Sequence, residues 1–501
     1  MKAKLKFLGG LVNEITGSSY LLRAYHGKKR LNVLIDAGLI QCNFNDSLEK
    51  NKEILNQIDP SQIDYIILTH SHIDHIGRLP LLVKNGFTGR IICTEGTASL
   101  LKIMLEDSAK IQVAEALYLN KKSKKEVSGG KSDRLTRGAY DRRRKTKRKE
   151  SIEPLYTSDD VAPTTDLIKN GGYPYHQWIH LSKDVAVKFY ASGHVMGGAV
   201  CVFRLKDGPG DTFLGFTGDL GRQDGIILPP PELVEEDLHI FVTESTYGGR
   251  VHPSRDEEID KIVELVRIAV KKKKRIIIPS FALERAQEII YLLSYYMSVK
   301  KIPIIPIFLD SPLASKITKV FSEAWSEGMF SDQGQLTFNP FSQENPYLKI
   351  ITEQKESDEL IAKSGPYIVI AGSGDCNSGR VRGHLRTNLP KKDTMVFLVG
   401  YMPKNSLGRN LKEKSLVRMN QEEIKVEAEI IPFDSFSAHA DSIFLRDYAR
   451  DNLKWGQEPK NIFIVHGELE SARTLKINLD MALSDKMIRT IIPENGDEFS
   501  F

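Results

Sequence analysis

The segment from His70 to His75, with the sequence HSHIDH, constrains this chain more than any other. It follows an apolar run that predicts a buried strand, so it lies at the carboxyl end of that strand, where α/β proteins place their chemistry. His70 and His72 alternate on extended backbone and can face one point, while Asp74 and His75 lie past the bend and can face another. Imidazole nitrogen and carboxylate oxygen are zinc ligands. The alternative, a solvated polar loop, leaves unexplained why three of the 12 histidines gather here.

Composition limits the classes of protein to which the chain can belong. Its 501 residues suffice for two or three domains, and 41% of them are hydrophobic. The four cysteines (Cys42, Cys93, Cys201 and Cys376) lie far apart, which argues against a disulfide framework and fits a reducing compartment. No signal-peptide core is visible, and no apolar run approaches the roughly 20 residues of a membrane span. We therefore expect a cytoplasmic protein with no membrane association.

One stretch carries the basic character of the chain. Residues 121–149 contain 14 Lys/Arg and 3 Asp/Glu, a local balance of +11, whereas the whole chain has a net charge of +5. The remaining residues therefore sum to −6. The stretch has few apolar residues to bury, which predicts a mobile insertion. It is either an electrostatic tether for phosphate backbones or only a solvated loop.

Other predicted strands also end in residues suited to metal binding or acid/base chemistry, each near a glycine. These residues are Asp36, His194, Asp219 and Glu244, which follow the apolar runs 31–35, 185–190, 212–216 and 240–243. Taken alone, Asp36 is equally well explained as an ordinary turn residue. This repeated pattern suits loops that reach an active site.

From about residue 250 the pattern changes to helices that alternate with short apolar runs. The helices are expected at 256–273 and 284–297, and the strands at 275–279, 305–309, 367–371 and 394–400. This order is typical of a parallel sheet covered by helices. Beyond about residue 430 the earlier pattern returns, with 430–433 before Ser437 and His439, and 460–465 before His466. We therefore expect one domain, residues 1–248 and 431–501, to be interrupted by a second, residues 249–430.

The order of these motifs resembles the metallo-β-lactamase fold, with Asp36 before the 70–75 segment and His194 and Asp219 after it. Glu244, the segment 437–441 (SAHAD) and the segment 466–468 (HGE) resemble the three additional motifs of the β-CASP nucleases. The resemblance covers nearly the whole chain. It implies an αββα sandwich that is interrupted by a β-CASP α/β cap domain with a mainly parallel sheet.

The chain departs from that family pattern in three places. Residues 372–380 differ from the Met-containing, Gly-rich segment that is usual there, and residues 400–408 lack the usual Glu-Gly-Thr. The basic stretch 121–149 is longer than the linker that the family leads us to expect. These departures avoid the expected metal ligands, so they bear on substrate preference more than on reaction type.

The resemblance assigns the metal ligands. It implies two Zn²⁺ ions, the first bound by His70, His72 and His194, the second by Asp74, His75 and His466, with Asp219 bridging. Seven nitrogen and oxygen ligands exceed what one tetrahedral zinc can use. Two metal ions about 3.5–4 Å apart can acidify a water and clamp the oxygens of a phosphodiester. Asp36 is then expected to orient a ligand histidine.

The additional motifs imply how the leaving 3′-oxygen gains its proton. His439 is the candidate general acid, and Glu244 is the carboxylate that holds it charged and oriented. The alternative for His439 is a core histidine bonded to backbone. Ser437 is a candidate to hydrogen-bond the scissile phosphate. The products expected from the resemblance are a 5′-phosphate and a 3′-hydroxyl.

The cap domain is expected to cover the metal face and to leave a cleft for a single strand, which would explain a preference for unpaired RNA. Basic residues near predicted strand ends are candidates to line that cleft, although each one alone is equally well explained as a solvated surface charge. They are Arg380, Arg382, Arg386, Lys404 and Arg409.

The leading hypothesis is a zinc-dependent ribonuclease acting on single-stranded RNA. A DNA-acting nuclease of the same family is the first alternative. A small-molecule metallo-hydrolase would not need a cap of about 180 residues, and a non-catalytic RNA-binding scaffold would not keep every ligand position filled. Endonuclease and 5′-to-3′ exonuclease activity both remain open. A homodimer is compatible with the sequence, but no motif indicates one.

Overall fold

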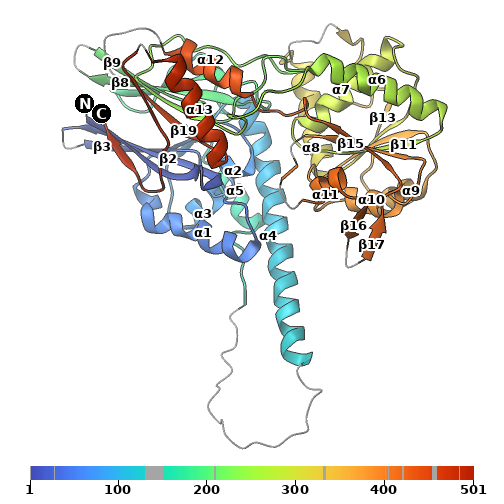
Figure 1. The fold of residues 1–501 in the computed structure, drawn as a ribbon. Coiled ribbons are helices and arrows are strands. Elements are labelled where there is room, and N and C mark those ends of the chain that lie inside the picture. The colour runs from blue at the N-terminus through green and yellow to red at the C-terminus, as the bar shows by residue number, and fades with distance from the viewer. Residues whose placement is uncertain are drawn as a thin grey trace, which may run out of the picture.

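The computed structural model describes residues 2–27, 29–129, 151–207, 210–330, 335–400, 402–403, 406–419, 422–453, 460–484 and 486–501. The chain forms two lobes that lie side by side (Figure 1). The sandwich lobe contains strands β1–β10 and β19–β21, and the cap lobe contains β11–β18. Both chain ends lie in the sandwich lobe, where β1 pairs with β21.

The sandwich lobe is built on two sheets that pack face to face. The first has the order β21 (Glu498–Ser500), β1 (Lys2–Leu11), β2 (Glu14–His26), β3 (Lys29–Ile35), β4 (Tyr65–Ile67) and β5 (Arg90–Ile92). The second has the order β20 (Ile488–Ile491), β19 (Lys460–Val465), β10 (Ile240–Glu244), β9 (Gly210–Phe216), β8 (Ala199–Asp207), β7 (Val185–Ala191) and β6 (Ile179–His180). The ring centroids of Phe7 and Phe463 lie 4.9 Å apart between the two sheets.

Alternation along the strands decides which side chains enter which layer. On β3, Val33 and Ile35 pack between the sheets, while Leu34 packs under the helices on the outer face. The helices on that face are α1 (Phe44–Gln57), α2 (Ile73–Ile76), α3 (Leu79–Lys84), α4 (Glu95–Gly129) and α5 (Val161–Thr165). Helices α12 (Ser442–Asn452) and α13 (Leu469–Ala482) cover the other sheet. This confirms the predicted αββα sandwich.

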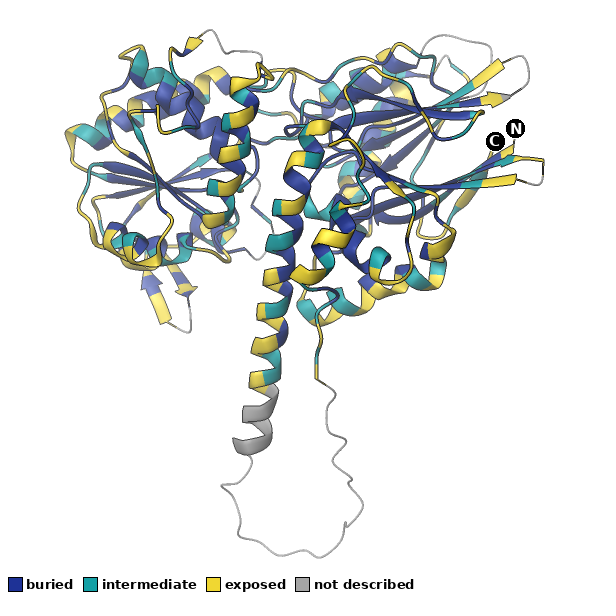
Figure 2. Cartoon of the chain, turned by 180° about the vertical axis from the view of Figure 1, so that it is seen from behind, coloured by how far each residue is buried: buried dark blue, intermediate teal, exposed yellow. Residues whose placement is uncertain are grey.

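The cap lobe has a six-stranded sheet that is parallel throughout. Its order is β13 (Leu348–Ile350), β12 (Ile307–Asp310), β14 (Tyr367–Ala371), β11 (Arg275–Pro279), β15 (Thr394–Val399) and β18 (Glu429–Phe433). One face is covered by α6 (Arg255–Lys271), α7 (Arg285–Ser298) and α8 (Pro312–Ser326), and the other by α9 (Gln354–Ala362), α10 (Val381–Asn388) and α11 (Leu407–Glu413). Figure 2 shows the buried strands between the helices. The hairpin of β16 (Leu416–Met419) and β17 (Glu422–Lys425) is separate.

The described structure differs from the expected domain organisation in two places. Strand β18 pairs with β15 in the cap sheet, so the boundary expected at residue 430 falls inside a strand. Its side chains explain why, because Ile431 and Phe433 pack into the core under the cap helices. Helix α4 continues to Gly129, so the mobile insertion expected from residue 121 begins with helix instead. Residues 121–129 contain no proline and four lysines, which favour helix.

The rest of the basic stretch, residues 130–149, lies outside the described residues. Figure 1 shows α4 running past the body of the molecule. Among the described helices, including α4, none combines the length and the apolarity that crossing a bilayer requires.

Candidate metal centre and active site

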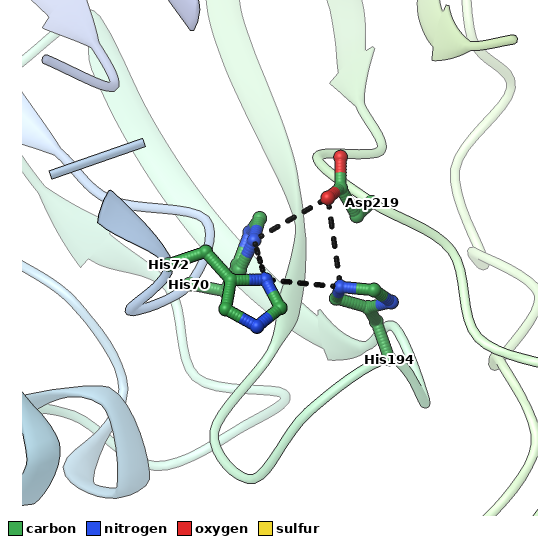
Figure 3. A group of neighbouring side chains, drawn as sticks. All are labelled: His70, His72, His194 and Asp219. Atoms are coloured by element: carbon green, nitrogen blue, oxygen red, sulfur yellow. Dashed lines mark hydrogen bonds and ion pairs between the residues drawn. The ribbon is translucent and has the colours of Figure 1, made fainter. Parts of the chain in front are cut away.

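The first group of ligand-type atoms comes from three strand ends. His70 and His72 follow β4, His194 follows β7, and Asp219 follows β9, and the four side chains converge (Figure 3). His72 Nδ1 lies 3.1 Å from His70 Nε2 and 3.2 Å from His194 Nε2. Asp219 Oδ2 lies 3.5 Å from His70 Nε2 and 3.5 Å from His194 Nε2. Ligand atoms about 2.0–2.2 Å from a tetrahedral zinc lie about 3.3–3.6 Å from one another, so these spacings suit a metal ion.

The second group shares Asp219 with the first. His466 Nε2 lies 3.3 Å from Asp74 Oδ2. The other carboxylate oxygen of Asp219, Oδ1, lies 3.4 Å from His75 Nε2 and 3.3 Å from His466 Nδ1. Asp219 Oδ2 therefore faces the first group and Oδ1 faces His75 Nε2 and His466 Nδ1, whereas Asp74 lies against the other ring nitrogen of His466, Nε2. Asp74 and His75 are on α2, while His466 follows β19 near the end of the chain.

Two buried atoms test whether a cation fits the second group. His75 Nε2 and Asp219 Oδ1 are buried and have no hydrogen-bond partner. Buried polar atoms are normally satisfied, and a metal ion between these two would satisfy both. The Nδ1 of His75 lies 2.7 Å from Asp36 Oδ2 and can donate to that carboxylate. Burial opposes the charged form of His75, but Asp219 and Asp36 raise its pKa well above the usual value, so a metal ion at Nε2 would displace a proton. The residues present therefore fit a metal bound through nitrogen and oxygen.

Asp36 is fully buried after β3, and its carboxylate contacts both Thr69 and the ligand His75. Its Oδ1 accepts a hydrogen bond from the Thr69 backbone N–H at 2.8 Å, and its Oδ2 accepts one from Thr69 Oγ1 at 2.8 Å. Gly38 allows this loop to approach α2, because a Cβ at that position would lie 1.6 Å from the Asp74 carbonyl oxygen. Sequence reasoning missed Thr69, although it stands directly before the motif.

Burial and neighbouring charge set the protonation of the ligands. Burial lowers the pKa of His72 to about 4 and the pKa values of His70 and His194 well below the usual value, so these imidazoles are neutral, as ligands must be. Burial opposes ionisation of Asp219, but the surrounding histidines His466, His75 and His70 hold its pKa well below the ordinary range. It is therefore a carboxylate at neutral pH.

Beside the metal ligands lies a histidine–carboxylate pair. His439 Nδ1 lies 3.2 Å from both carboxylate oxygens of Glu244, and the His439 ring centroid is 4.5 Å from that of His194. Glu244 is fully buried at the end of β10, and its Oε1 also accepts a hydrogen bond from Leu220 N at 2.7 Å. Burial opposes the charged form of His439, but Glu244 raises its pKa to about 9.

The loop that carries His439 is held by a residue that sequence reasoning missed. His252 Nε2 donates to the His439 carbonyl oxygen at 3.0 Å, and the His252 backbone N–H donates to Asp441 Oδ2 at 3.2 Å. Burial, assisted by Arg222, lowers the pKa of His252 to about 4, so the ring is neutral. His252 does not directly follow a strand end, because β10 ends at Glu244, so the signal that identified the other site residues was absent.

Ser437 is buried, and its Oγ accepts a hydrogen bond from the His439 backbone N–H at 3.2 Å. Tyr247 also bonds to Ser437 through its side chain. The serine therefore shapes the turn that carries His439, whose ring lies beside His194.

The predicted cleft arginines occupy different environments. Arg380 is tied within the cap, because Nη1 donates to the buried Asp310 at 2.8 Å and Nη2 donates to the Thr352 carbonyl at 2.9 Å. Arg382 donates to the Asn377 carbonyl at 2.9 Å, and Arg386 pairs with Glu422 at 2.7 Å.

Arg409 is exposed and pairs with Glu413 at 2.6 Å. It lines a cavity of about 450 Å³ together with Tyr247, Arg250 and Lys412, which places it on the His439 side of the molecule. Lys404 lies outside the described residues.

Comparison with known families matches three models along the chain. The metallo-β-lactamase superfamily matches residues 12–280, the β-CASP domain matches residues 286–411, and a zinc-dependent metallo-hydrolase RNA specificity domain matches residues 423–493. The first match contains every proposed metal ligand except His466. His466 lies in the third match.

Similar proteins extend over nearly all of the chain. It is 30% identical to the ribonuclease TTHA0252 of Thermus thermophilus over 93% of this chain and 94% of that protein. It is 27% identical to cleavage and polyadenylation specificity factor subunit 3-I of Arabidopsis thaliana and 28% identical to the endoribonuclease YSH1 of Eremothecium gossypii. These two matches include 96% and 94% of this chain, but the chain spans only 61% and 55% of the relatives' own length.

Sequence motifs, the two-lobed architecture, the site geometry and these matches agree. The chain belongs to the metallo-β-lactamase superfamily, in the group whose members carry a β-CASP domain.

Proposed function

We propose that this protein is a zinc-dependent ribonuclease that hydrolyses phosphodiester bonds of single-stranded RNA and leaves 5′-phosphate and 3′-hydroxyl ends. The observation that carries the proposal is the His439–Glu244 pair beside the cluster of metal ligands. A metal centre alone would serve many hydrolases, whereas a buried acid/base pair beside it suits a poor leaving group such as a sugar alkoxide. The names of the relatives and the RNA specificity model support RNA as the substrate.

His70, His72 and His194 would hold one zinc ion, Asp74, His75 and His466 would hold the second, and Asp219 would bridge them. When bound, two zinc ions supply Lewis acidity that acidifies water toward a pKa of about 7 and polarises phosphoryl oxygens. Asp36 would keep His75 in the tautomer that presents Nε2 to this position.

His439 would deliver the proton to the leaving 3′-oxygen. Its Nδ1 faces Glu244, so the proton available for transfer is on Nε2. Glu244 favours the imidazolium before transfer, and its full burial strengthens that interaction. His252 holds the His439 carbonyl oxygen and so fixes the loop from which the ring projects. Ser437 is retained as a candidate contact to the scissile phosphate, since its hydroxyl lies in the same turn.

The cap lobe would restrict the site to a single strand. Arg409 is the best placed of the predicted cleft arginines, because it is exposed and shares a cavity with Tyr247 beside Ser437. The side chain of Arg380 is paired with Asp310, so Arg380 would stabilise the cap and would not contact RNA. A cytoplasmic location is part of the proposal, and the free thiols of all four cysteines support it.

The test is digestion of 5′-labelled and internally labelled RNA and single-stranded DNA under the same conditions. We expect RNA to be cleaved and to leave ends that a 5′-phosphate-dependent exonuclease accepts. Preferential cleavage of DNA would replace the proposal with the DNA-acting alternative. A ladder of internal products would identify an endonuclease, and release of mononucleotides from the 5′ end would identify an exonuclease.

A further inference from the structure

A second cavity, of about 470 Å³, lies between the two lobes, and its lining includes none of the proposed metal ligands. The sandwich lobe contributes the loop 222–226, which begins shortly after Asp219. The cap lobe contributes Arg255 at the start of α6 and tyrosines of α7, and His252 lies between the two sides. A cavity of this size falls in the range of small-molecule sites, which run from about 300 to 1,000 Å³.

Two arginines line this cavity with donors that have no acceptor. Arg222 is 8% exposed and Arg255 is 6% exposed. Arg222 Nη1 and both Nε and Nη1 of Arg255 are buried without a hydrogen-bond partner. A buried donor without an acceptor costs free energy, and a guanidinium costs more than a neutral group. The protein therefore satisfies these donors incompletely, since Nε and Nη1 of Arg255 have carboxylate oxygens only at ion-pair range.

The carboxylates nearby do not fully pair with these arginines. Asp224 bonds to Arg222 through both oxygens, at 2.6 Å and 2.7 Å, and approaches Arg255 only to 3.7 Å. Glu288 is bonded to Arg285 and approaches Arg255 only to 3.9 Å. Arg255 thus has two carboxylates at ion-pair range and neither within hydrogen-bond distance.

Two further carboxyl groups belong to the same region. Burial, assisted by Glu288, raises the pKa of Glu284 well above its usual value, so this carboxyl is neutral and adds no negative charge. Asp256 is exposed where the cavity opens to solvent. The guanidiniums of Arg222 and Arg255 are buried, whereas the carboxylate of Asp224, like that of Asp256, is exposed to solvent. An anion bound at Arg255 would add a buried counter-charge.

The opposite wall is aromatic. Tyr291, Tyr295 and Tyr296 line the cavity from α7. The rings of Tyr291 and Tyr295 are parallel within 3°, with centroids 6.4 Å apart, and Tyr296 meets Tyr295 edge-on at 5.3 Å. Aromatic faces beside arginines are the combination on which nucleotides bind, because the base stacks while the guanidiniums take the phosphate.

We infer that this cavity is a second nucleotide-binding site, in which Arg222 and Arg255 hold a phosphate and the tyrosines of α7 stack the base. The ligand contacts both lobes, and it also contacts His252, which holds the His439 loop. Occupancy would therefore join the lobes and support the loop of the proposed general acid. The inference goes beyond the proposed function and rests on it only in naming RNA as one source of the nucleotide.

The experiment is isothermal titration calorimetry of the zinc-loaded full chain with adenosine 5′-monophosphate, inorganic phosphate and adenosine. We expect the nucleotide to bind more tightly than either fragment. Arg255→Gln should weaken both the nucleotide and phosphate about tenfold or more, because it removes the charged donors. Tyr296→Leu should weaken the nucleotide but leave phosphate unchanged. Arg267→Gln is the matched control, since Arg267 is on the same helix with its side chain 51% exposed.

Wild-type nucleotide affinity in a folded Arg255→Gln protein would overturn the inference, as would no binding to the wild type. If Arg255→Gln does not fold, the Tyr296→Leu variant tests the inference instead. A ratio of nucleotide affinity to phosphate affinity equal to that of the wild type would exclude base stacking. If a non-cleavable single-stranded RNA oligomer displaces the bound nucleotide, the site binds a nucleotide of the RNA strand. If the oligomer and the nucleotide bind at the same time, the site binds a free mononucleotide. Binding requires no cleavage, so a protein that binds through Arg255 yet cuts no RNA would refute only the proposed function.

Discussion

His439 and Glu244 divide the proposed proton transfer between a donor and a group that keeps the donor charged. His439→Ala should lower RNA cleavage by about 10²–10⁴-fold, the usual contribution of a general acid, and leave the zinc content unchanged. Single-turnover kinetics and metal analysis measure the two quantities. An RNA with sulfur in place of the bridging 3′-oxygen should recover most of the rate, because a thiolate leaves without a proton.

His180→Ala is the control for this prediction, since His180 is exposed on β6, the edge strand of the second sheet. Unchanged turnover of His439→Ala with ordinary RNA would show that another group protonates the leaving oxygen.

Asp36 acts on the metal centre through His75. Asp36→Asn keeps the shape of the side chain but weakens the bond at 2.7 Å that selects the tautomer of His75. We expect zinc affinity to fall about 10–100-fold, as is typical when a carboxylate behind a ligand histidine is removed. Competition with a chromogenic chelator measures the affinity, and Asp46→Asn, on the exposed face of α1, serves as the control. Equal affinity in both variants would make Asp36 a purely structural residue.

Helix α4 departs from the sequence prediction, because it extends into the basic stretch as far as Gly129. The helix reaches Gly129, so a deletion that tests the basic charge must begin at residue 130. Removing residues 130–149 should leave folding and zinc content intact, weaken RNA binding and reduce its salt dependence, because fewer counterions are released.

Replacing residues 130–149 with a Gly/Ser segment of equal length separates charge from length in this test. Fluorescence anisotropy at several salt concentrations provides the measurement. Identical affinities for the deletion, the replacement and the wild type at every salt concentration would show that the stretch does not bind RNA.

The whole molecule is coupled to its metal centre, because the ligands come from distant parts of the chain. His70 and His466 are separated by almost the whole sequence, so a metal ion between these groups ties the first sheet to the second. We expect about two zinc ions for each chain. Chelation should lower Tm by several degrees and zinc should restore it, since a ligand of the folded state alone stabilises that state. Calorimetry with and without a chelator checks this.

His466→Ala should remove one zinc ion and retain the other, since it belongs to only one of the two groups. A metal-free protein with full RNA cleavage would contradict the metal centre altogether.

Residues with a local signature could be predicted from the chain alone. His70, His194 and Asp219 each follow an apolar run, and His194 and Asp219 also adjoin glycine, so the strand ends and the ligand chemistry were visible together. His252 does not directly follow a strand end, and its partners are the His439 carbonyl and Asp441, nearly 190 residues later. Arg380 has the composition of a substrate contact, but the fold gives it Asp310, 70 residues earlier, as a partner. Neither pairing leaves a local pattern to detect.

The sequence by itself predicted a cluster of histidine and aspartate side chains that suits a metal site, because these residues follow successive strand ends. It also determined the two-lobed architecture, since alternating and continuous apolar runs predict different sheets. Only the tertiary structure decided that β18 joins the cap, that Asp36 faces His75, and that buried arginines from both lobes meet in one cavity. These are long-range contacts, and their energies depend on burial and on partners that no neighbouring residue reveals.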